Sequence, residues 1–243
     1  MKKDRLSYSA LAQFKKSPNH LLAYWNREMK TTDAMQFGSL IHKLILEPEK
    51  FGDDFAIFEG ARRQGKAWIE FSEANQDKTI IKQQELDDAN RIINNAMKNQ
   101  VLCDMLKNSI HREMKLEWQY KGVNFLGFAD LYTTYNDKKC VVDIKTTSDA
   151  GKRFERDLYY NNYKMQLAMY QDQFDKDTDV YIVAIETSNP FNVQVYKLDE
   201  SLLFKGWLDY DHYLEKYNEW DGEPTGYSKS IIEVKVENKN KQK

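Results

Sequence analysis

The chain has 243 residues, of which 30% are charged, 41% are hydrophobic and 13% are aromatic. This balance is typical of a globular protein and excludes a disordered chain, and the length suffices for one domain with one substantial core. The net charge of −2 excludes a general attraction to nucleic acid, so binding to a phosphate backbone would need local basic patches.

Membrane and metal-cluster classes are also excluded by the composition. No apolar run approaches the length of a membrane span, and Met1–Arg5 leads into no signal-type segment, so we expect a cytoplasmic protein without membrane contact. The two cysteines, Cys103 and Cys140, lack metal-type spacing and are expected to be reduced, which excludes a four-cysteine iron–sulfur cluster.

Helical signals dominate residues 1–110. Ser7 or Ser9 can cap a first short helix, and Ser17-Pro18 starts a second one with the proline at its first position. Further predicted elements are helices over 34–46, 67–71, 83–98 and 101–106 and a brief extended piece at 79–81.

Two features of this part have both an ordinary and a functional interpretation. His42 lies on the helix over 34–46, four residues after Gly38 and therefore on the same face, and taken alone it is an ordinary partly buried histidine. Arg62-Arg63-Gln64-Gly65-Lys66 is a basic loop. Solvated surface is the ordinary explanation, and contact with a phosphate backbone is the alternative.

Residues 111–222 alternate between strand and helix periodicity. Strands over 111–120, 125–134 and 139–146 form a predicted antiparallel meander with turns at 121–124 and 136–137. Helices over 152–158, 163–174 and 201–220 and strands over 179–186 and 191–198 follow. We therefore expect a single domain over 1–243 of the α/β (α+β) class, with a central mixed sheet flanked by helices and a flexible tail at 233–243.

Acidic and basic side chains gather at the ends of the predicted strands. Alternation places Asp143 and Lys145 on one face, while Val142 and Ile144 point into the core. Charges at the end of a buried strand need partners or a metal, and with Asp130 on the previous strand they meet the minimum for a magnesium site. A lysine there can orient or deprotonate water and stabilise phosphate charge. The alternative is a simple salt bridge.

Neighbouring elements add candidates to this site. The short turns of the meander place either Glu113 or Glu117 within reach of the two aspartates. On the helix over 163–174, Tyr163, Gln166 and Tyr170 are spaced so that they form a row along one side.

The pattern Gly127-x-x-Asp130, Asp143-Ile144-Lys145 and Gln166-x-x-x-Tyr170 resembles the PD-(D/E)XK nuclease superfamily. Within it, the chain is similar to RecE-like phage and prophage exonucleases of the exodeoxyribonuclease VIII type. Most of the chain takes part in the resemblance, through the segments 6–11, 17–18, 37–42, 46–51 and 65–68. In two departures, Ala129 replaces the proline of the motif and Asp143 stands where many members have glutamate, but neither removes a ligand.

The resemblance implies a restriction-endonuclease-like core over 111–222 with a metal-dependent site. Its metal ligands would be His42, Asp130, Asp143, the backbone carbonyl of Ile144 and Glu113, with Glu117 as a rival of Glu113. Its catalytic residues would be Lys145, Asp130, Asp143, Gln166 and Tyr170, and the candidates for DNA contact are Arg62, Arg63 and Lys66.

The implied activity is hydrolysis of DNA phosphodiester bonds with Mg²⁺, or Mn²⁺ in its place, 5′-to-3′ on linear double-stranded DNA in phage-type recombination. Implied partners are duplex ends, a single-strand annealing recombinase and further copies in a homo-oligomeric ring. One alternative is a structure-specific or endo-acting nuclease of the same superfamily. Another is an inactive DNA-binding or assembly module, against which the intact Asp130, Asp143 and Lys145 argue.

Overall fold

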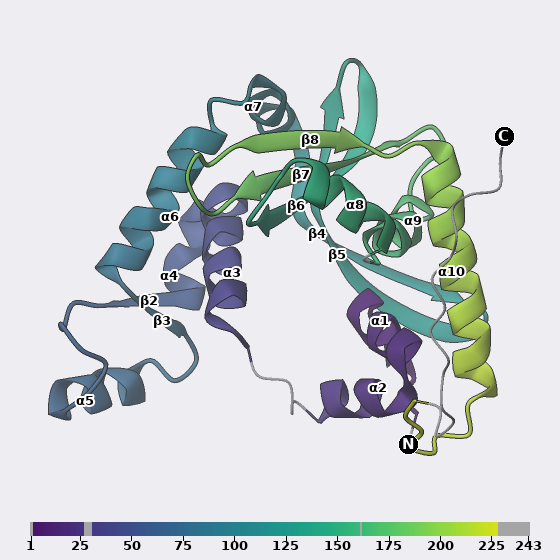
Figure 1. The fold of residues 1–243 in the computed structure, drawn as a ribbon, viewed down its shortest axis with the longest axis horizontal. Helices are drawn as coiled ribbons and strands as arrows, with labels where there is room; N and C mark the ends of the chain where they lie inside the picture. The colour runs from purple at the N-terminus through teal and green to yellow at the C-terminus, as the bar shows by residue number, and fades with distance from the viewer. Residues whose placement is uncertain (1, 27–30, 161, 228–243) are drawn as a thin grey trace, which may run out of the picture.

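A six-stranded mixed sheet with helices on both faces forms the centre of the protein (Figure 1). The computed structural model describes residues 2–26, 31–160 and 162–227, so the tail predicted at 233–243 lies outside the described residues. The prediction of a central mixed sheet flanked by helices is confirmed. Among the described residues, no helix is both long enough and apolar enough to cross a bilayer.

The sheet is built around an antiparallel meander. Its strands are β1 (Arg5–Leu6), β4 (Ser109–Tyr120), β5 (Val123–Tyr135), β6 (Lys138–Thr147), β7 (Asp179–Glu186) and β8 (Val193–Lys197). β4, β5 and β6 form the meander as predicted, β7 runs parallel to β6, and β8 returns antiparallel to β7. β1 was not predicted, and it adds a short parallel pairing to β5 at Asn124 and Phe125.

Two tight turns set the register of the meander. Lys121 and Gly122 have φ angles of 45° and 79°, and Asn136 and Asp137 have φ angles of 49° and 60°. Two successive left-handed residues match the right-handed twist of the flanking strands. The turn predicted over 121–124 is therefore shorter than expected, because Val123 already belongs to β5.

The two faces of the sheet have separate cores. Val142 and Ile144 join one cluster, while Val141 joins the other, as alternation along β6 requires. The first face is covered by α3 (Asp33–Leu46), α6 (Gln83–Ala96) and α7 (Gln100–Lys107), and a short η1 (Pro48–Lys50) and α4 (Phe51–Asp54) follow α3. The second face is covered by α1 (Tyr8–Lys16), α2 (Pro18–Trp25), α8 (Lys152–Tyr160), α9 (Tyr163–Gln171) and α10 (Glu200–Glu219).

Side-chain caps define where several of these helices begin. Ser7 accepts a hydrogen bond from the Ala10 N–H at 3.2 Å, so Ser7 and not Ser9 caps α1. Ser17 caps α2 with Pro18 at the first turn, as predicted. Such caps satisfy amide groups that have no partner within the helix.

A small arm projects beside α3 and α6 (Figure 1, lower left). It contains a two-stranded parallel sheet of β2 (Phe55–Phe58) and β3 (Thr79–Lys82), and α5 (Lys66–Ala74) lies between these strands in sequence. Parallel strands need such a crossover connection. The sequence predicted a helix over 67–71, within α5, and the extended piece at 79–81, but it missed β2.

One edge of β5 opens between two partners. β4 pairs with almost the whole of β5, whereas on the other edge β1 pairs only with residues 124–125 and β6 only with residues 131–135. Residues 126–130 therefore have no strand partner on that edge. We call this opening the β5–β6 fork, and it lies where Asp130 enters the site.

Gly206 of α10 marks a close approach to α9, because a Cβ atom there would lie 2.1 Å from the carbonyl oxygen of Lys164. Alanine normally stabilises a helix interior relative to glycine, but here the overlap with rigid backbone should dominate. We expect Gly206→Ala to lower the free energy of unfolding by about 1–3 kcal/mol in urea denaturation.

The matched control is Gly52→Ala in α4, where an added Cβ would meet nothing within 4 Å. We expect this variant to be neutral or stabilised by up to about 1 kcal/mol. Equal stabilities of the two variants would contradict the close approach of α9 and α10.

Candidate active site

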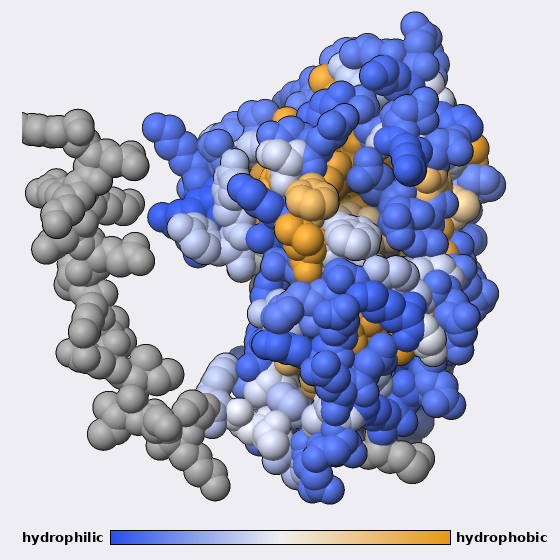
Figure 2. All heavy atoms as spheres, turned by 90° about the vertical axis from the view of Figure 1, so that its right-hand side faces the viewer, coloured by the Kyte–Doolittle hydropathy of each residue, from blue (hydrophilic) through white to orange (hydrophobic). Residues whose placement is uncertain are grey.

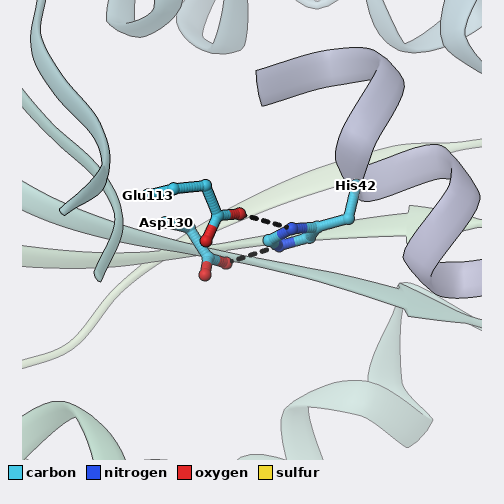
Figure 3. Close-up of side chains that lie close together, drawn as sticks. All are labelled: His42, Glu113 and Asp130. Atoms are coloured by element: carbon cyan, nitrogen blue, oxygen red, sulfur yellow. Dashed lines mark hydrogen bonds and ion pairs between the residues drawn. The ribbon is translucent and has the colours of Figure 1, made fainter. Parts of the chain in front are cut away.

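His42 lies between the carboxylates of Glu113 and Asp130 (Figure 3). Its Nε2 is 2.8 Å from Asp130 Oδ2, and its Nδ1 is 3.0 Å from Glu113 Oε1. These side chains come from α3, β4 and β5, and one ligand atom of each lies within 4.8 Å of the others. Among the described residues, this triad is the group with metal-ligand spacing.

The backbone brings the two acids face to face. Arg112 pairs with Leu131 and Met114 pairs with Ala129, so Glu113 lies opposite Asp130 between these pairs. The φ angle of Glu113 is 48°, a left-handed conformation that interrupts the regular strand. Two like charges at opposing positions repel each other, and the imidazole between them offsets this repulsion.

Electrostatics at the triad favour a charged imidazole. Burial by itself would lower the pKa of His42, but hydrogen bonds and negative charges of Asp130 and Glu113 outweigh it and raise the pKa to about 10. Burial by itself would also raise the pKa of Asp130, yet the hydrogen bond and charge of His42 hold it below its ordinary value. Without a metal, the His42 imidazole therefore keeps its proton, and a metal that binds to His42 would have to displace this proton.

Asp130 is also tied to the β5–β6 fork. The backbone N–H of Ile144 donates a hydrogen bond of 2.7 Å to Asp130 Oδ2. Ile144 itself packs in the core on the α3 face, so this amide is held in place. The predicted role of the Ile144 carbonyl as a metal ligand stays a prediction.

Asp143 and Lys145 share one face of β6, as alternation predicted, but that face is buried at Asp143, which is only 2% exposed. Lys145 Nζ donates a hydrogen bond of 2.9 Å to Asp143 Oδ1 and lies 2.8 Å from Oδ2. The buried Oδ2 atom has no hydrogen bond of acceptable geometry. Burial raises the pKa of Asp143 to about 6, although Lys145 opposes this shift.

Three tyrosines surround the Asp143–Lys145 pair. Lys145 Nζ lies 5.6 Å from the ring centroid of Tyr163, and Tyr8 and Tyr170 interact electrostatically with the pair. Burial raises the pKa of Tyr8 above its usual range, so its hydroxyl stays protonated. Tyr8 was missed in the sequence because α1 is far from β6 along the chain. The only available signal was its place in the segment 6–11.

Tyr170 and Gln166 lie on the buried side of α9, next to the fork. Tyr170 is hydrogen-bonded to the Gln166 side chain and to the backbone of Phe128. A Cβ atom on Gly127 would lie 2.6 Å from the Tyr170 ring, so glycine permits this contact. The Tyr170 side chain therefore bonds to a backbone group of β5 that a neighbouring strand would otherwise bond to at this edge.

A cleft of about 780 Å³ gives access to the site from solvent. Its lining includes His42, Glu113, Asp130 and Lys145. Gly38 lies on the same wall, and a Cβ atom there would lie 2.8 Å from the Thr146 hydroxyl. The glycine thus allows α3 to approach the end of β6.

The donor set in the cleft fits a divalent cation. The carboxylate oxygens of Glu113 and Asp130 suit metals such as Mg²⁺ or Mn²⁺, and neutral His42 could add one nitrogen. Asp143 Oδ2, which has an ion pair with Lys145 but no hydrogen bond of acceptable geometry, is a further oxygen donor. Asp143 is not part of the triad within 4.8 Å, so the predicted ligand set divides into the triad and the Asp143–Lys145 pair.

The remaining candidates lie away from the triad. Glu117 is in ion pairs with Arg5 and Lys115, at 3.9 Å and 2.9 Å, so Glu113 and not Glu117 is the acid beside His42. The basic loop belongs to the projecting arm, where Arg63 pairs with Glu85 at 2.6 Å. Contact of Arg62, Arg63 and Lys66 with DNA stays a prediction.

Comparison with known proteins identifies the family and the fold of the chain. The chain matches, over residues 7–224, the model of the family described as "PDDEXK-like domain of unknown function (DUF3799)". The crystal structure of a "Putative exonuclease" from Eubacterium rectale matches with a TM-score of 0.60 and 12% identity, covering 89% of this chain and 82% of that chain. That match shows a common fold.

A second crystal structure, of SSO0001, has 15% identity and covers 87% of this chain and 77% of its own, but its TM-score of 0.39 is too low to indicate a common fold. No curated protein matches the chain significantly. The family match covers nearly all of the described residues, including the fork, the triad and the Asp143–Lys145 pair. The chain therefore belongs to the PDDEXK-like domain family, within the PD-(D/E)XK superfamily.

Proposed function

We propose that the protein is a metal-dependent deoxyribonuclease that hydrolyses phosphodiester bonds. The observation that supports this most is the convergence of the His42–Glu113–Asp130 triad and the Asp143–Lys145 pair at the β5–β6 fork, beside one open cleft. A structural salt bridge would need neither the triad nor a cleft. Membership of the PDDEXK-like family supports the same reaction class.

Different residues of the site would bind the metal and orient its ligands. A bound Mg²⁺ would activate water and stabilise charge on the phosphate. His42, Glu113 and Asp130 would hold it, and the Asp143 Oδ2 atom and the Ile144 carbonyl complete the proposed ligand set. The amide of Ile144 orients Asp130, which limits the freedom of that carboxylate before substrate arrives.

Lys145 would act through its positive charge. Its pKa is raised, because the attraction of Asp143 and Asp130 outweighs the effect of burial, so the ammonium group keeps its proton. The side chain is 24% exposed and lines the cleft, which lets Nζ reach a phosphate oxygen. Of the two roles expected for this lysine, stabilisation of charge is favoured over deprotonation of water.

The finer assignment is an exonuclease that acts 5′-to-3′ on linear duplex DNA in phage-type recombination in the cytoplasm. It is supported by the RecE-like motifs and by the fold that the chain shares with the exonuclease described from Eubacterium rectale. A single-strand annealing recombinase as partner and a homo-oligomeric ring belong to the same proposal. Mn²⁺ is expected to replace Mg²⁺.

End dependence can be measured with linear duplex DNA labelled at either the 5′ or the 3′ end, alongside a covalently closed circle. We expect Mg²⁺-dependent digestion of the linear DNA only, with early release of the 5′ label, and loss of activity in EDTA. Cleavage of the closed circle would instead identify an endo-acting nuclease. Early release of the 3′ label would reverse the proposed polarity.

Lys145→Gln tests the proposed role of the ammonium group, because glutamine can still donate a hydrogen bond to Asp143 but carries no charge. We expect kcat to fall about 100-fold or more, while thermal unfolding stays close to that of the parent protein. Lys139→Gln is the matched control, since Lys139 lies near the other end of β6 and its side chain is 56% exposed. Similar activities of the two variants would contradict the proposed role.

Glu113→Gln and Glu117→Gln separate the two acids of β4 that the sequence left as rivals. We expect Glu113→Gln to raise the Mg²⁺ concentration for half-maximal activity by at least about tenfold, because it removes a charged oxygen ligand. Glu117→Gln should leave the Mg²⁺ titration unchanged. The reverse result would transfer the ligand role to Glu117.

A further inference from the structure

An exposed aromatic side chain stands beside the triad. Phe128 is 46% exposed, although it lies on the same strand as the buried Asp130, two residues before it. Residues two apart on a strand face the same side, so Phe128 and Asp130 both face the open side of the β4–β5 ribbon. The proposed reaction does not use Phe128.

The same face of the ribbon continues away from the triad. Across the strand pair, Lys115 lies opposite Phe128, and Glu117 lies opposite Leu126. Leu126 in turn lines a pocket of about 480 Å³ together with Arg5 and aromatic residues of α2. Asp130, Phe128 and Leu126 thus form a strip on one face of β5, and Leu126 at its end also lines this pocket.

The pocket combines aromatic and cationic groups. Tyr24 and Trp25 line it, and Lys3 Nζ lies 5.2 Å from the centroid of the Trp25 ring. Aromatic faces interleaved with cationic groups are the combination that binds unpaired nucleotides, because bases stack on the rings while cations follow the backbone.

The backbone under Phe128 is fixed from behind. Tyr170 packs against Gly127 and is hydrogen-bonded to the backbone of Phe128. The exposed ring therefore stands on a rigid support, and little additional freedom is lost when a ligand stacks on it.

The charge of the strip favours an unpaired strand over an intact duplex. Its cationic groups, Lys3, Arg5 and Lys115, are offset in part by Asp4 and Glu117. An intact duplex presents mainly phosphates and needs a strongly basic surface, whereas an unpaired strand also offers its bases. Base stacking contributes more than an exposed ion pair, so the aromatic groups should decide what binds.

We infer that Phe128, Leu126 and the pocket beside Trp25 form a subsite for an unpaired nucleotide strand next to the scissile phosphate. This inference rests on the proposed nuclease function and extends it. The substrate strand would leave the duplex before it reaches the triad, and its terminal bases would stack along the strip.

Fluorescence anisotropy with a labelled short oligothymidine, in Ca²⁺ to suppress turnover, tests the subsite. We expect Phe128→Ala to raise the Kd for this single strand about tenfold, and Phe128→Trp to bind at least as tightly as the parent protein. A duplex closed by a hairpin at each end should bind more weakly and should not respond to either substitution.

Phe204→Ala is the matched control, because Phe204 is 61% exposed and lies on α10. The side of the molecule on which α10 lies is mostly hydrophilic and has a small apolar area (Figure 2). Its Kd for the oligothymidine should equal that of the parent protein. An unchanged Kd in Phe128→Ala, or an equal loss for single strand and closed duplex, would overturn the subsite.

The outcomes for the subsite and for the nuclease are distinguishable. If the parent protein digests DNA but Phe128→Ala binds oligothymidine normally, the subsite is wrong and the nuclease stands. If binding depends on Phe128 but no DNA is digested, the strip binds single strands and the nuclease assignment fails. A parent protein that does not bind oligothymidine refutes the subsite.

Discussion

The candidate site depends on polar groups that offset the buried negative charge of Asp130, at the point where β5 and β6 separate. Asp130 is only 8% exposed, and such a charge is costly to bury unless polar groups surround it. One hydrogen bond comes from the Ile144 amide and another contact from His42. Because β6 pairs only with residues 131–135 of β5, that amide can reach a side chain. The opening in the sheet therefore lowers the cost of burying the Asp130 charge and leaves this side chain accessible from the cleft.

The elements around the fork are arranged to keep it open. On one side, Gly38 lets α3 approach Thr146 closely enough for His42 to reach Asp130. On the other side, Tyr170 lies against Gly127 and bonds to the β5 backbone where no strand pairs. Each contact requires a glycine at one position, so these two glycines define how near the helices approach the sheet.

Much of the fold follows from local patterns in the sequence. The meander follows from strand alternation and from the turn at Asn136-Asp137, which adopts the left-handed conformation that asparagine and aspartate tolerate best among non-glycine residues. The strand β1 could not be predicted, since two residues are too few to show the alternation of a strand. β2 was also not predicted, because its four residues pair with β3 only through a crossover that includes α5.

The site was less predictable from the sequence than the sheet. Alternation placed Asp143 and Lys145 together, but it gives Glu113 and Glu117 the same face and cannot rank them. The position of α3 along β4 separates these acids, and this is a tertiary feature. Tyr8 lies far from β6 in sequence, so no local pattern connects it to Lys145. Such contacts appear only when both cores have formed.

The contact between His42 and Asp130 joins residues that are 88 positions apart in the chain. The pair at Asp143 and Lys145 and the tyrosines of α9 come later still. During synthesis, an emerging chain therefore holds only fragments of the site until α9 has left the ribosome, and pairings of this range form slowly. A chain that ended before α9 would thus hold the triad and the Asp143–Lys145 pair but would lack Gln166 and Tyr170, which lie beside the fork.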